Sequence, residues 1–167
     1  QNEINDIGHL IEEGSRRGFR VCFNPAPFSD AVRDLPLASV DILIVNQTEA
    51  ADLAGEERPE AAMDHLTATH PLCKIVLTLG EDGVLFGCGS ERLRVPAVAT
   101  RVVDTTAAGD TFIGYFLAAQ AEDLPIRDAL ETAVAAAALC VSRPGACDSI
   151  PGRDAVARLV ASHQATK

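Results

Sequence analysis

The segment 104–111 (DTTAAGDT) holds the residues of this chain that are best suited to chemistry. Apolar helical spacing without proline follows it, so we expect Ala107, Ala108 and Gly109 in the first turn of a helix. The N–H groups of a first turn lack intrahelical partners and lie at the positive end of the helix dipole, which suits a phosphate or an oxyanion. Asp110 lies in the same turn and is a candidate general base. The segment therefore predicts a phosphoryl-transfer site.

A simpler interpretation of the same segment is an ordinary helix start. Thr105 or Thr106 would then be the N-cap, and the acidic residues would lie near a positive helix end. Judged on local chemistry alone, the two interpretations are evenly balanced.

Strand and helix patterns alternate along the chain, which predicts an α/β fold with a mostly parallel sheet covered by helices. The apolar stretches 19–23, 40–45 and 75–79 are the expected strands of the sheet. The strands 84–88 and 91–95 are expected to form an antiparallel hairpin at its edge. Helices are expected at 4–18, 48–54, 59–69, 107–121, 126–142 and 152–162, and the helix at 126–142 has a face of small residues that permits close packing.

Polar residues directly follow three of the expected strands, at Asn24, Asn46 and the turn 78–80. Ligands of parallel α/β sheets collect beyond the carboxyl ends of the strands, so this edge is an expected binding site. Asn46 and Glu49 also have a structural interpretation, since Asn46 or Thr48 can cap the next helix with Glu49 in its first turn. From the residues alone, capping is favoured over metal binding.

Composition excludes several classes of protein. The 167 residues have the length of one domain and contain no repeat or linker. A net charge of −10 with two lysines argues against a surface for nucleic acid or an anionic membrane. No apolar run reaches ~18 residues, and the first residues lack the pattern of an export signal. The five cysteines form no C-x-x-C pair, so we expect reduced thiols in a cytoplasmic protein rather than zinc or disulfides.

Five segments resemble the ribokinase-like carbohydrate kinase family in their order and spacing. They are 24–27 (NPAP), 46–50 (NQTEA), 78–83 (TLGEDG), 104–110 (DTTAAGD) and 143–151 (RPGACDSIP). The resemblance implies a three-layer α/β/α fold. Because enzymes of the family are longer and begin with a sugar-binding half and a β-sheet lid, it also implies that residues 1–167 form the C-terminal, nucleotide-binding portion of such a domain. The family usually has glycine where Ala107 stands, but the N–H group is retained.

The resemblance implies the catalytic roles. Asp110 would remove the proton from the sugar hydroxyl, and the N–H groups of Ala107, Ala108 and Gly109 would stabilise the charge on the phosphoryl group. Asn46 and Glu49 match an Asn-x-x-Glu element that organises Mg²⁺ and its waters near the phosphates. Mg²⁺ commonly keeps several waters, so one glutamate acting through water is chemically sufficient.

The resemblance also implies a nucleotide site. Thr78, Gly80 and Gly83 would lie along the ATP molecule, which Asn46 and Gly109 would also contact. Val134 stands where the family can place an adenine-contacting histidine, so hydrophobic packing on the base remains but a polar contact is in doubt. A turn of this composition is weak evidence by itself, because turns use glycine for geometry more often than for ligands.

A monovalent-cation site is implied by two loops. Oxygen ligands, mostly neutral, suit K⁺ better than a transition metal. The segment 143–145 could instead merely end a helix, but the uninterrupted spacing from Asp110 to Gly145 favours the cation. The matching ligands are the Asp104 carboxylate, the carbonyls of Thr106, Cys140, Arg143 and Gly145, and the Ser149 hydroxyl.

Taken with the resemblance, the sequence leads us to expect phosphorylation of a sugar hydroxyl by ATP, with Mg²⁺ and K⁺, and D-ribose as the sugar. Glu3 and Asp110 would be the sugar contacts within this chain. The family implies a homodimer of the full-length enzyme, and we expect the 167-residue chain alone to be inactive. The alternatives are another sugar or nucleoside kinase of the family and a non-catalytic nucleotide-binding remnant.

Overall fold

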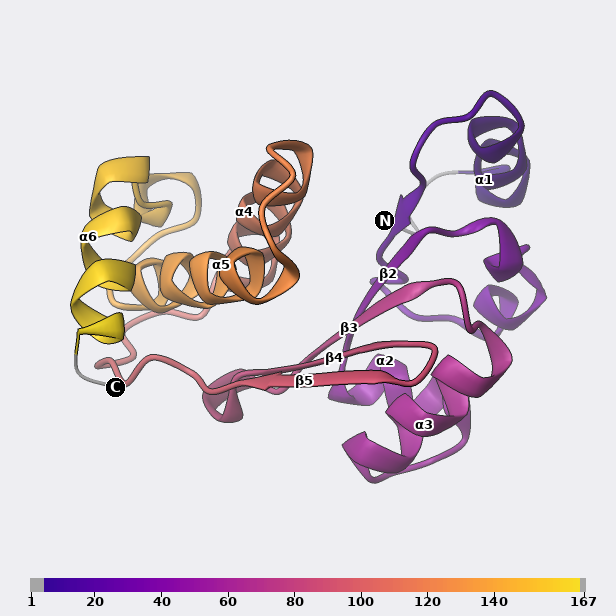
Figure 1. Cartoon of the computed structure of the whole chain (residues 1–167), viewed down its shortest axis with the longest axis horizontal. Helices are drawn as coiled ribbons and strands as arrows, with labels where there is room; N and C mark the ends of the chain where they lie inside the picture. The colour runs from indigo at the N-terminus through magenta and orange to yellow at the C-terminus, as the bar shows by residue number, and fades with distance from the viewer. Residues whose placement is uncertain (1–4, 166–167) are drawn as a thin grey trace. The chain divides into compact units, whose positions relative to one another are not determined.

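The computed structural model describes residues 5–165 and shows a five-stranded sheet with helices before, between and after its strands (Figure 1). The expected α/β class is confirmed. The helices are α1 (Ile7–Arg16), α2 (Gln47–Ala54), α3 (Pro59–Thr69), α4 (Ala108–Ala121), α5 (Ile126–Val141) and α6 (Arg153–Gln164). The strands are β1 (Cys22–Phe23), β2 (Ile42–Asn46), β3 (Lys74–Thr78), β4 (Val84–Cys88) and β5 (Glu91–Val95).

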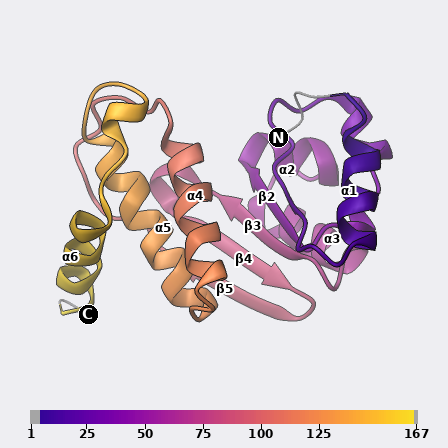
Figure 2. The ribbon, with the colours of Figure 1, turned by 90° about the horizontal axis from the view of Figure 1, so that it is seen from above.

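The sheet has the strand order β1-β2-β3-β4-β5. The first three strands are parallel, with Asn46 of β2 opposite Thr78 of β3. β4 runs against β3 in Figure 2, and a two-residue turn joins it to β5, a connection that only antiparallel strands permit. The sheet is therefore mixed, with a parallel part and an edge hairpin as the sequence predicted.

The strand expected at 19–23 is wrong in extent, because only Cys22 and Phe23 pair in the sheet. Val21 instead donates its N–H group to the Asp41 carboxylate at 2.7 Å, and Phe19 is 64% exposed. The Val21 carbonyl accepts the N–H groups of Asp41 and Ile42 at 2.9 and 3.1 Å, so regular strand pairing begins only after Val21.

The chain divides into two compact units. The first comprises residues 1–79 and 85–94, and the second residues 80–84 and 95–167. In the first unit α3 packs on the sheet so closely that a Cβ atom at Gly87 would lie 2.5 Å from the Met63 sulfur. A larger residue at that position of β4 would require the Met63 and Thr67 side chains to shift.

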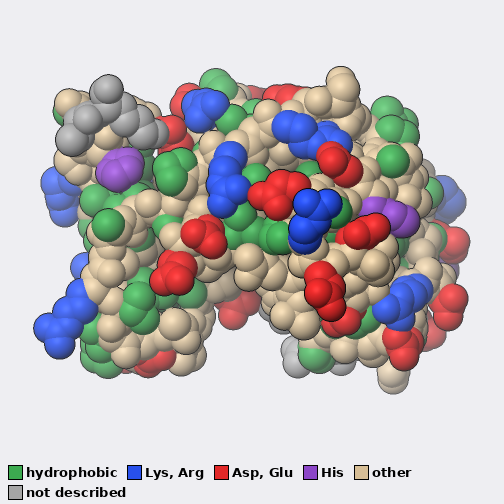
Figure 3. Space-filling model, turned by 90° about the horizontal axis from the view of Figure 1, so that it is seen from below, with side chains coloured by type: hydrophobic (Ala, Val, Ile, Leu, Met, Phe, Trp, Pro, Cys, Tyr) green, Lys and Arg blue, Asp and Glu red, His purple; other side chains and the backbone are tan. Residues whose placement is uncertain are grey.

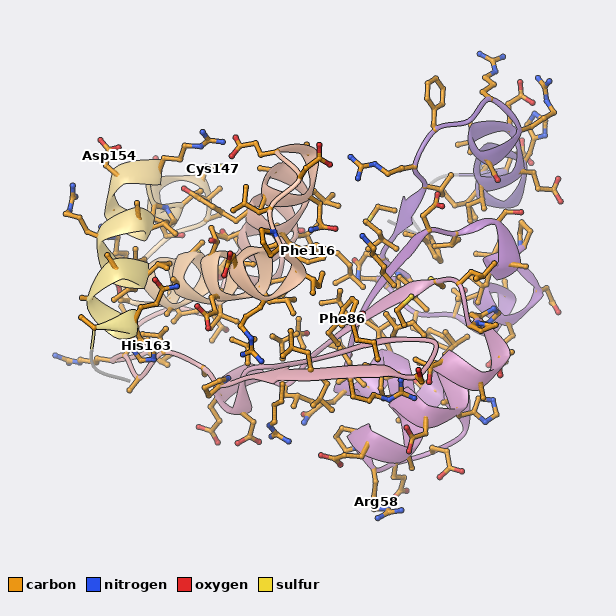
Figure 4. The ribbon with its side chains drawn as sticks, viewed as in Figure 1. Arg58, Phe86, Phe116, Cys147, Asp154 and His163 are labelled. Atoms are coloured by element: carbon orange, nitrogen blue, oxygen red, sulfur yellow. The ribbon has the colours of Figure 1, made fainter. Side chains whose placement is uncertain are left out.

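In the second unit α4 and α5 pack against each other through small side chains. Of the predicted small-residue face, Ala133, Val134 and Ala138 are buried, whereas Ala137 and Val141 are half-buried. Phe112 and Phe116 of α4 stack with ring centroids 6.2 Å apart, and Phe116, labelled in Figure 4, is fully buried. This packing fixes the helix that carries the candidate catalytic residue.

On the face drawn in Figure 3, acidic and basic side chains are interspersed, and no large basic area appears on it. Within residues 5–165, the helices are either too short or too polar to cross a membrane. No disulfide joins the five cysteines, all of which the structure describes.

Candidate active site

The start of α4 differs from an ordinary capped helix. Its N-cap is Ala107, with φ 61° in the left-handed region, and no side chain caps it. The alternative that Thr105 or Thr106 is the N-cap is therefore wrong. The Ala108 N–H group donates to the Thr105 carbonyl at 3.2 Å, so a tight turn leads into the helix.

The first turn of α4 is open to a ligand at Gly109. Gly109 is exposed, and a Cβ atom built there would meet no other atom within 4 Å. A phosphate can therefore approach the backbone at the positive end of the helix, which fits the predicted anion site. Asp110 is exposed in the same turn, whereas Thr111, the next residue, is 3% exposed and faces the interior of the unit. The carboxylate of Asp110 is thus reachable by a substrate.

The Asp104 carboxylate joins the two loops predicted to bind a cation. Its Oδ1 atom accepts the Thr106 N–H group at 2.9 Å, and its Oδ2 atom accepts the Gly145 N–H group at 3.0 Å. Hydrogen bonds from Thr106, and then from Gly145, lower the pKa of Asp104 from 3.8 to about 2. Gly145 has φ 97°, a backbone conformation that favours glycine. Asp104 is therefore ionised at neutral pH.

Other predicted cation ligands also lie in contact. The Cys140 sulfur lies 3.7 Å from the Thr106 carbonyl oxygen and 3.2 Å from the Ser149 hydroxyl oxygen. The Arg143 N–H group donates to the Cys140 carbonyl at 3.1 Å, as expected where a helix ends. One carboxylate among neutral oxygens is a donor set that suits K⁺. The structure thus brings the six residues together in one unit, and their role as ligands stays a prediction.

Asn46 and Glu49 form a capping box at the start of α2. The Asn46 Oδ1 atom accepts the Glu49 N–H group at 2.9 Å, and the Glu49 Oε2 atom accepts the Asn46 N–H group at 3.0 Å. The capping interpretation is confirmed, with Asn46 rather than Thr48 as the cap. Glu49 is only 6% exposed, so a carboxylate is held in place beside a strand end. Such a group fits water-mediated binding of Mg²⁺, which stays a prediction.

The expected meeting of polar residues at the carboxyl ends of the parallel strands is confirmed within the first unit. Asn46 lies directly opposite Thr78, whose hydroxyl group is 3.4 Å from the Val45 carbonyl oxygen. Asn24 donates its side-chain amide to the Ile44 carbonyl at 2.8 Å. Strand pairing alone therefore brings these three residues to one sheet edge.

The glycines of the turn after β3 have a geometric role. Gly80 has φ 60° and Gly83 has φ 93°, and a Cβ atom at Gly83 would lie 2.1 Å from the Val95 carbonyl oxygen. This requirement is independent of any nucleotide, whose contact with the turn stays a prediction.

Two further predicted contacts have little support. Val134 is 6% exposed and lines only a small cavity, and its contact with adenine stays a prediction. Glu3 lies outside the described residues.

The sequence analysis missed a set of buried polar contacts beneath the first turn of α4. Thr111 donates its hydroxyl group to the Cys140 sulfur at 3.4 Å, and Tyr115 donates to the Pro151 carbonyl at 2.5 Å. A hydroxyl residue on the apolar side of the helix, beside Phe112, was the available signal. The partners lie about 30 residues away in the sequence and could not be identified from it.

Residues 5–153 match the pfkB family of carbohydrate kinases, so the chain belongs to that family. It is 33% identical to deoxyribokinase of Salmonella typhi over 158 residues, covering 89% of this chain and 50% of that protein. It is 35% identical to ribokinase of Lactococcus lactis over 154 residues, covering 90% of this chain and 49% of that protein. The chain spans about half the length of the curated relatives it matches.

The fold is that of ribokinase-like proteins. The structure of Arabidopsis thaliana ribokinase complexed with ribose and ATP matches with a TM-score of 0.82 and 31% identity. The match covers 92% of this chain and 51% of that one.

Proposed function

We propose that the intact protein containing this chain transfers the γ-phosphoryl group of ATP to a hydroxyl group of a pentose, the O5 hydroxyl of D-ribose. Residues 1–167 would form its C-terminal, nucleotide-binding portion. The observation that carries the proposal is the open first turn of α4, where an accessible backbone at Gly109 adjoins the exposed Asp110. Membership of the pfkB family supports a sugar substrate, and the solved ribokinase with ribose and ATP supports this pair of substrates.

The chemistry follows from the positions of these groups. Asp110 accepts the proton of the sugar hydroxyl as its oxygen forms a bond to the γ-phosphorus and the bond from that phosphorus to the β,γ-bridging oxygen breaks. The N–H groups at residues 107–110 stabilise the negative charge on the phosphoryl oxygens during transfer. Glu49 would hold Mg²⁺ through water, and the bound ion would neutralise phosphate charge.

The loops joined by Asp104 would bind K⁺ beside this turn and hold its N–H groups in position for the phosphoryl group. We further propose a cytoplasmic enzyme, in keeping with the five free thiols of this chain, and a homodimer, as the family resemblance implies.

The proposal is tested by measuring ADP release from the intact protein with ATP, Mg²⁺ and a panel of D-ribose, 2-deoxy-D-ribose, fructose and adenosine. D-Ribose should give the highest kcat/KM. A higher value for deoxyribose would favour the activity named for the Salmonella relative, and a higher value for fructose or adenosine would favour another kinase of the family. Binding of ATP without turnover on any acceptor would favour a non-catalytic remnant.

The role of Asp110 has its own test. Asp110→Asn in the intact protein should lower kcat by roughly 10²–10⁴ and leave the affinity for ATP almost unchanged, because only proton transfer is lost. Turnover within a few-fold of wild type would remove Asp110 from the role of base. Asp128→Asn, at an exposed position in the first turn of α5, is the matched control and should leave kcat unchanged.

A further inference from the structure

A chain of three buried side chains connects the first turn of α4 to the loop before α6. Thr111 is 3% exposed, and Cys140 and Ser149 are fully buried. The Thr111 hydroxyl lies 3.4 Å from the Cys140 sulfur, which lies 3.2 Å from the Ser149 hydroxyl. The Ser149 hydroxyl in turn lies 2.6 Å from the Ala146 carbonyl oxygen. Because they are buried, their hydrogen-bond partners among residues 5–165 are one another and the backbone.

The direction of donation along this chain follows from its last member. A carbonyl oxygen only accepts, so the Ser149 hydroxyl donates its single proton to Ala146. The Ser149 hydroxyl oxygen then accepts the thiol proton of Cys140, whose sulfur also lies 3.7 Å from the Thr106 carbonyl oxygen. The sulfur is left as an acceptor for the Thr111 hydroxyl. Each side chain donates once and accepts from its neighbour, apart from Thr111 at the start.

The Cys140 thiol lies between two parts of the proposed active site. Thr111 directly follows Asp110 in the sequence. Ser149 lies in the same loop as Gly145, whose N–H group donates a hydrogen bond to the Asp104 carboxylate. Cys140 is the middle member and, through Thr106, also contacts the segment that leads into α4. Loss of the thiol would remove the acceptor of the buried Thr111 hydroxyl and the donor to Ser149, and it would break the connection between the start of α4 and the loop 145–149.

We propose that Cys140 is a positioning residue for phosphoryl transfer, whose thiol sets the first turn of α4 against the loop 145–149. This rests on the proposed function. The thiol touches no substrate, and it acts by holding Asp110 and the adjacent N–H groups in place relative to the cation loops. Positioning of this kind acts on kcat and on the response to K⁺ more than on ATP binding.

The test compares Cys140→Ala with Cys140→Ser in the intact protein. Cys140→Ala should lower kcat about tenfold and raise the K⁺ concentration for half-maximal activity about fivefold, with KM for ATP within about twofold of wild type. Cys140→Ser keeps a donor and an acceptor and should stay within about threefold of wild type in kcat. Thr111→Val removes the first donor without shortening the side chain and should reproduce the effect of Cys140→Ala.

The matched control is Cys73→Ala, which truncates another buried thiol in the first unit. It should lower the melting temperature and leave kcat and the K⁺ response unchanged. The proposal is overturned if Cys140→Ala has the kinetic constants of wild type, or if Cys140→Ser is impaired as strongly as Cys140→Ala.

A second measurement separates this proposal from the proposed function. If wild type phosphorylates no sugar, the proposed function fails. The role of Cys140 is then tested by melting curves, in which K⁺ replaces a bulky organic cation at constant ionic strength and the rise in melting temperature is measured. A rise in wild type and Cys140→Ser that is lost in Cys140→Ala supports positioning of the cation loops by the thiol. An equal rise in all three proteins, or none in wild type, overturns it.

Discussion

Ala107 places a side chain where the backbone conformation favours glycine. Its φ of 61° is the left-handed conformation, which costs an L-residue about 1–2 kcal/mol. Replacing this alanine by glycine would remove that cost. Glycine is more flexible than alanine in the unfolded chain, however, and the larger loss of entropy on folding offsets about 0.4–1 kcal/mol of the stabilisation. Ala107→Gly should therefore raise the free energy of unfolding of the intact protein by about 0.5–1 kcal/mol, measured by urea denaturation.

The control for this variant is Ala118→Gly, an exposed position inside α4. It should destabilise the protein by about 1 kcal/mol, because glycine is a poor helix former. If the two variants lose stability equally, the left-handed conformation of Ala107 is wrong.

Asp104 predicts a specific dependence of stability on pH. The pKa of its carboxyl group is about 2 in the folded protein, compared with an ordinary value of 3.8. The folded state therefore favours the ionised carboxylate. The stability that it contributes is fully present above about pH 4 and is lost as the pH falls from there through about 2. Asp104→Asn keeps an acceptor but has no charge to titrate. The difference in unfolding free energy between wild type and Asp104→Asn should be constant from pH 7 to about 5 and should shrink toward pH 2.5.

Urea denaturation across that pH range checks the expectation, and Asp123→Asn, at an exposed position after α4, serves as the control. A difference between wild type and Asp104→Asn that does not change with pH would rule out the lowered pKa of Asp104.

The helices and the hairpin were predictable from sequence because their signals are local. The hairpin strands occupy 84–88 and 91–95 as predicted, and the three C-terminal helices agree within two residues at each end. The short β1 was not predictable in extent, since strand length depends on a neighbour across the sheet. The Thr111–Cys140–Ser149 contacts were missed for the same reason, because their members lie far apart in the sequence, and the left-handed conformation of Ala107 was also not predicted.

The start of α2 shows how one element can serve structure and ligand binding together. Glu49 closes a capping box and is also the expected Mg²⁺ residue, so Glu49→Ala would disturb both functions. Glu49→Gln separates them, because a glutamine oxygen can still accept the Asn46 N–H group whereas the charge is lost. It should leave the melting temperature nearly unchanged and raise the Mg²⁺ concentration for half-maximal activity by about 10–100-fold.

Steady-state assays over a Mg²⁺ series, with melting curves of the same samples, test this expectation. Glu60→Gln, an exposed glutamate in the first turn of α3, is the control. An unchanged Mg²⁺ requirement in Glu49→Gln would leave Glu49 with the capping role alone.

At the scale of the whole molecule, most of the residues that we propose for phosphoryl transfer lie among the described residues, whereas few proposed sugar contacts do. Asp110 is the one predicted sugar contact among residues 5–165, and it is exposed to solvent. The matched relatives are about twice as long as this chain. Transfer to a sugar rather than to water requires the acceptor to be held in place and water to be excluded. We therefore expect both requirements to depend on parts of the intact protein outside residues 1–167.

A polypeptide limited to residues 1–167 should therefore show no ribose-dependent release of ADP from ATP under conditions in which the intact protein turns over. The comparison needs a folded sample, so its circular dichroism and melting curve are recorded beside the assay. Any slow loss of ATP in this polypeptide should be independent of ribose and should persist in Asp110→Asn, because it would reflect water attack without the catalytic base. Robust phosphorylation of ribose by the polypeptide would show that residues 1–167 themselves enclose the sugar. The prediction that sugar binding needs residues outside this segment would then be wrong.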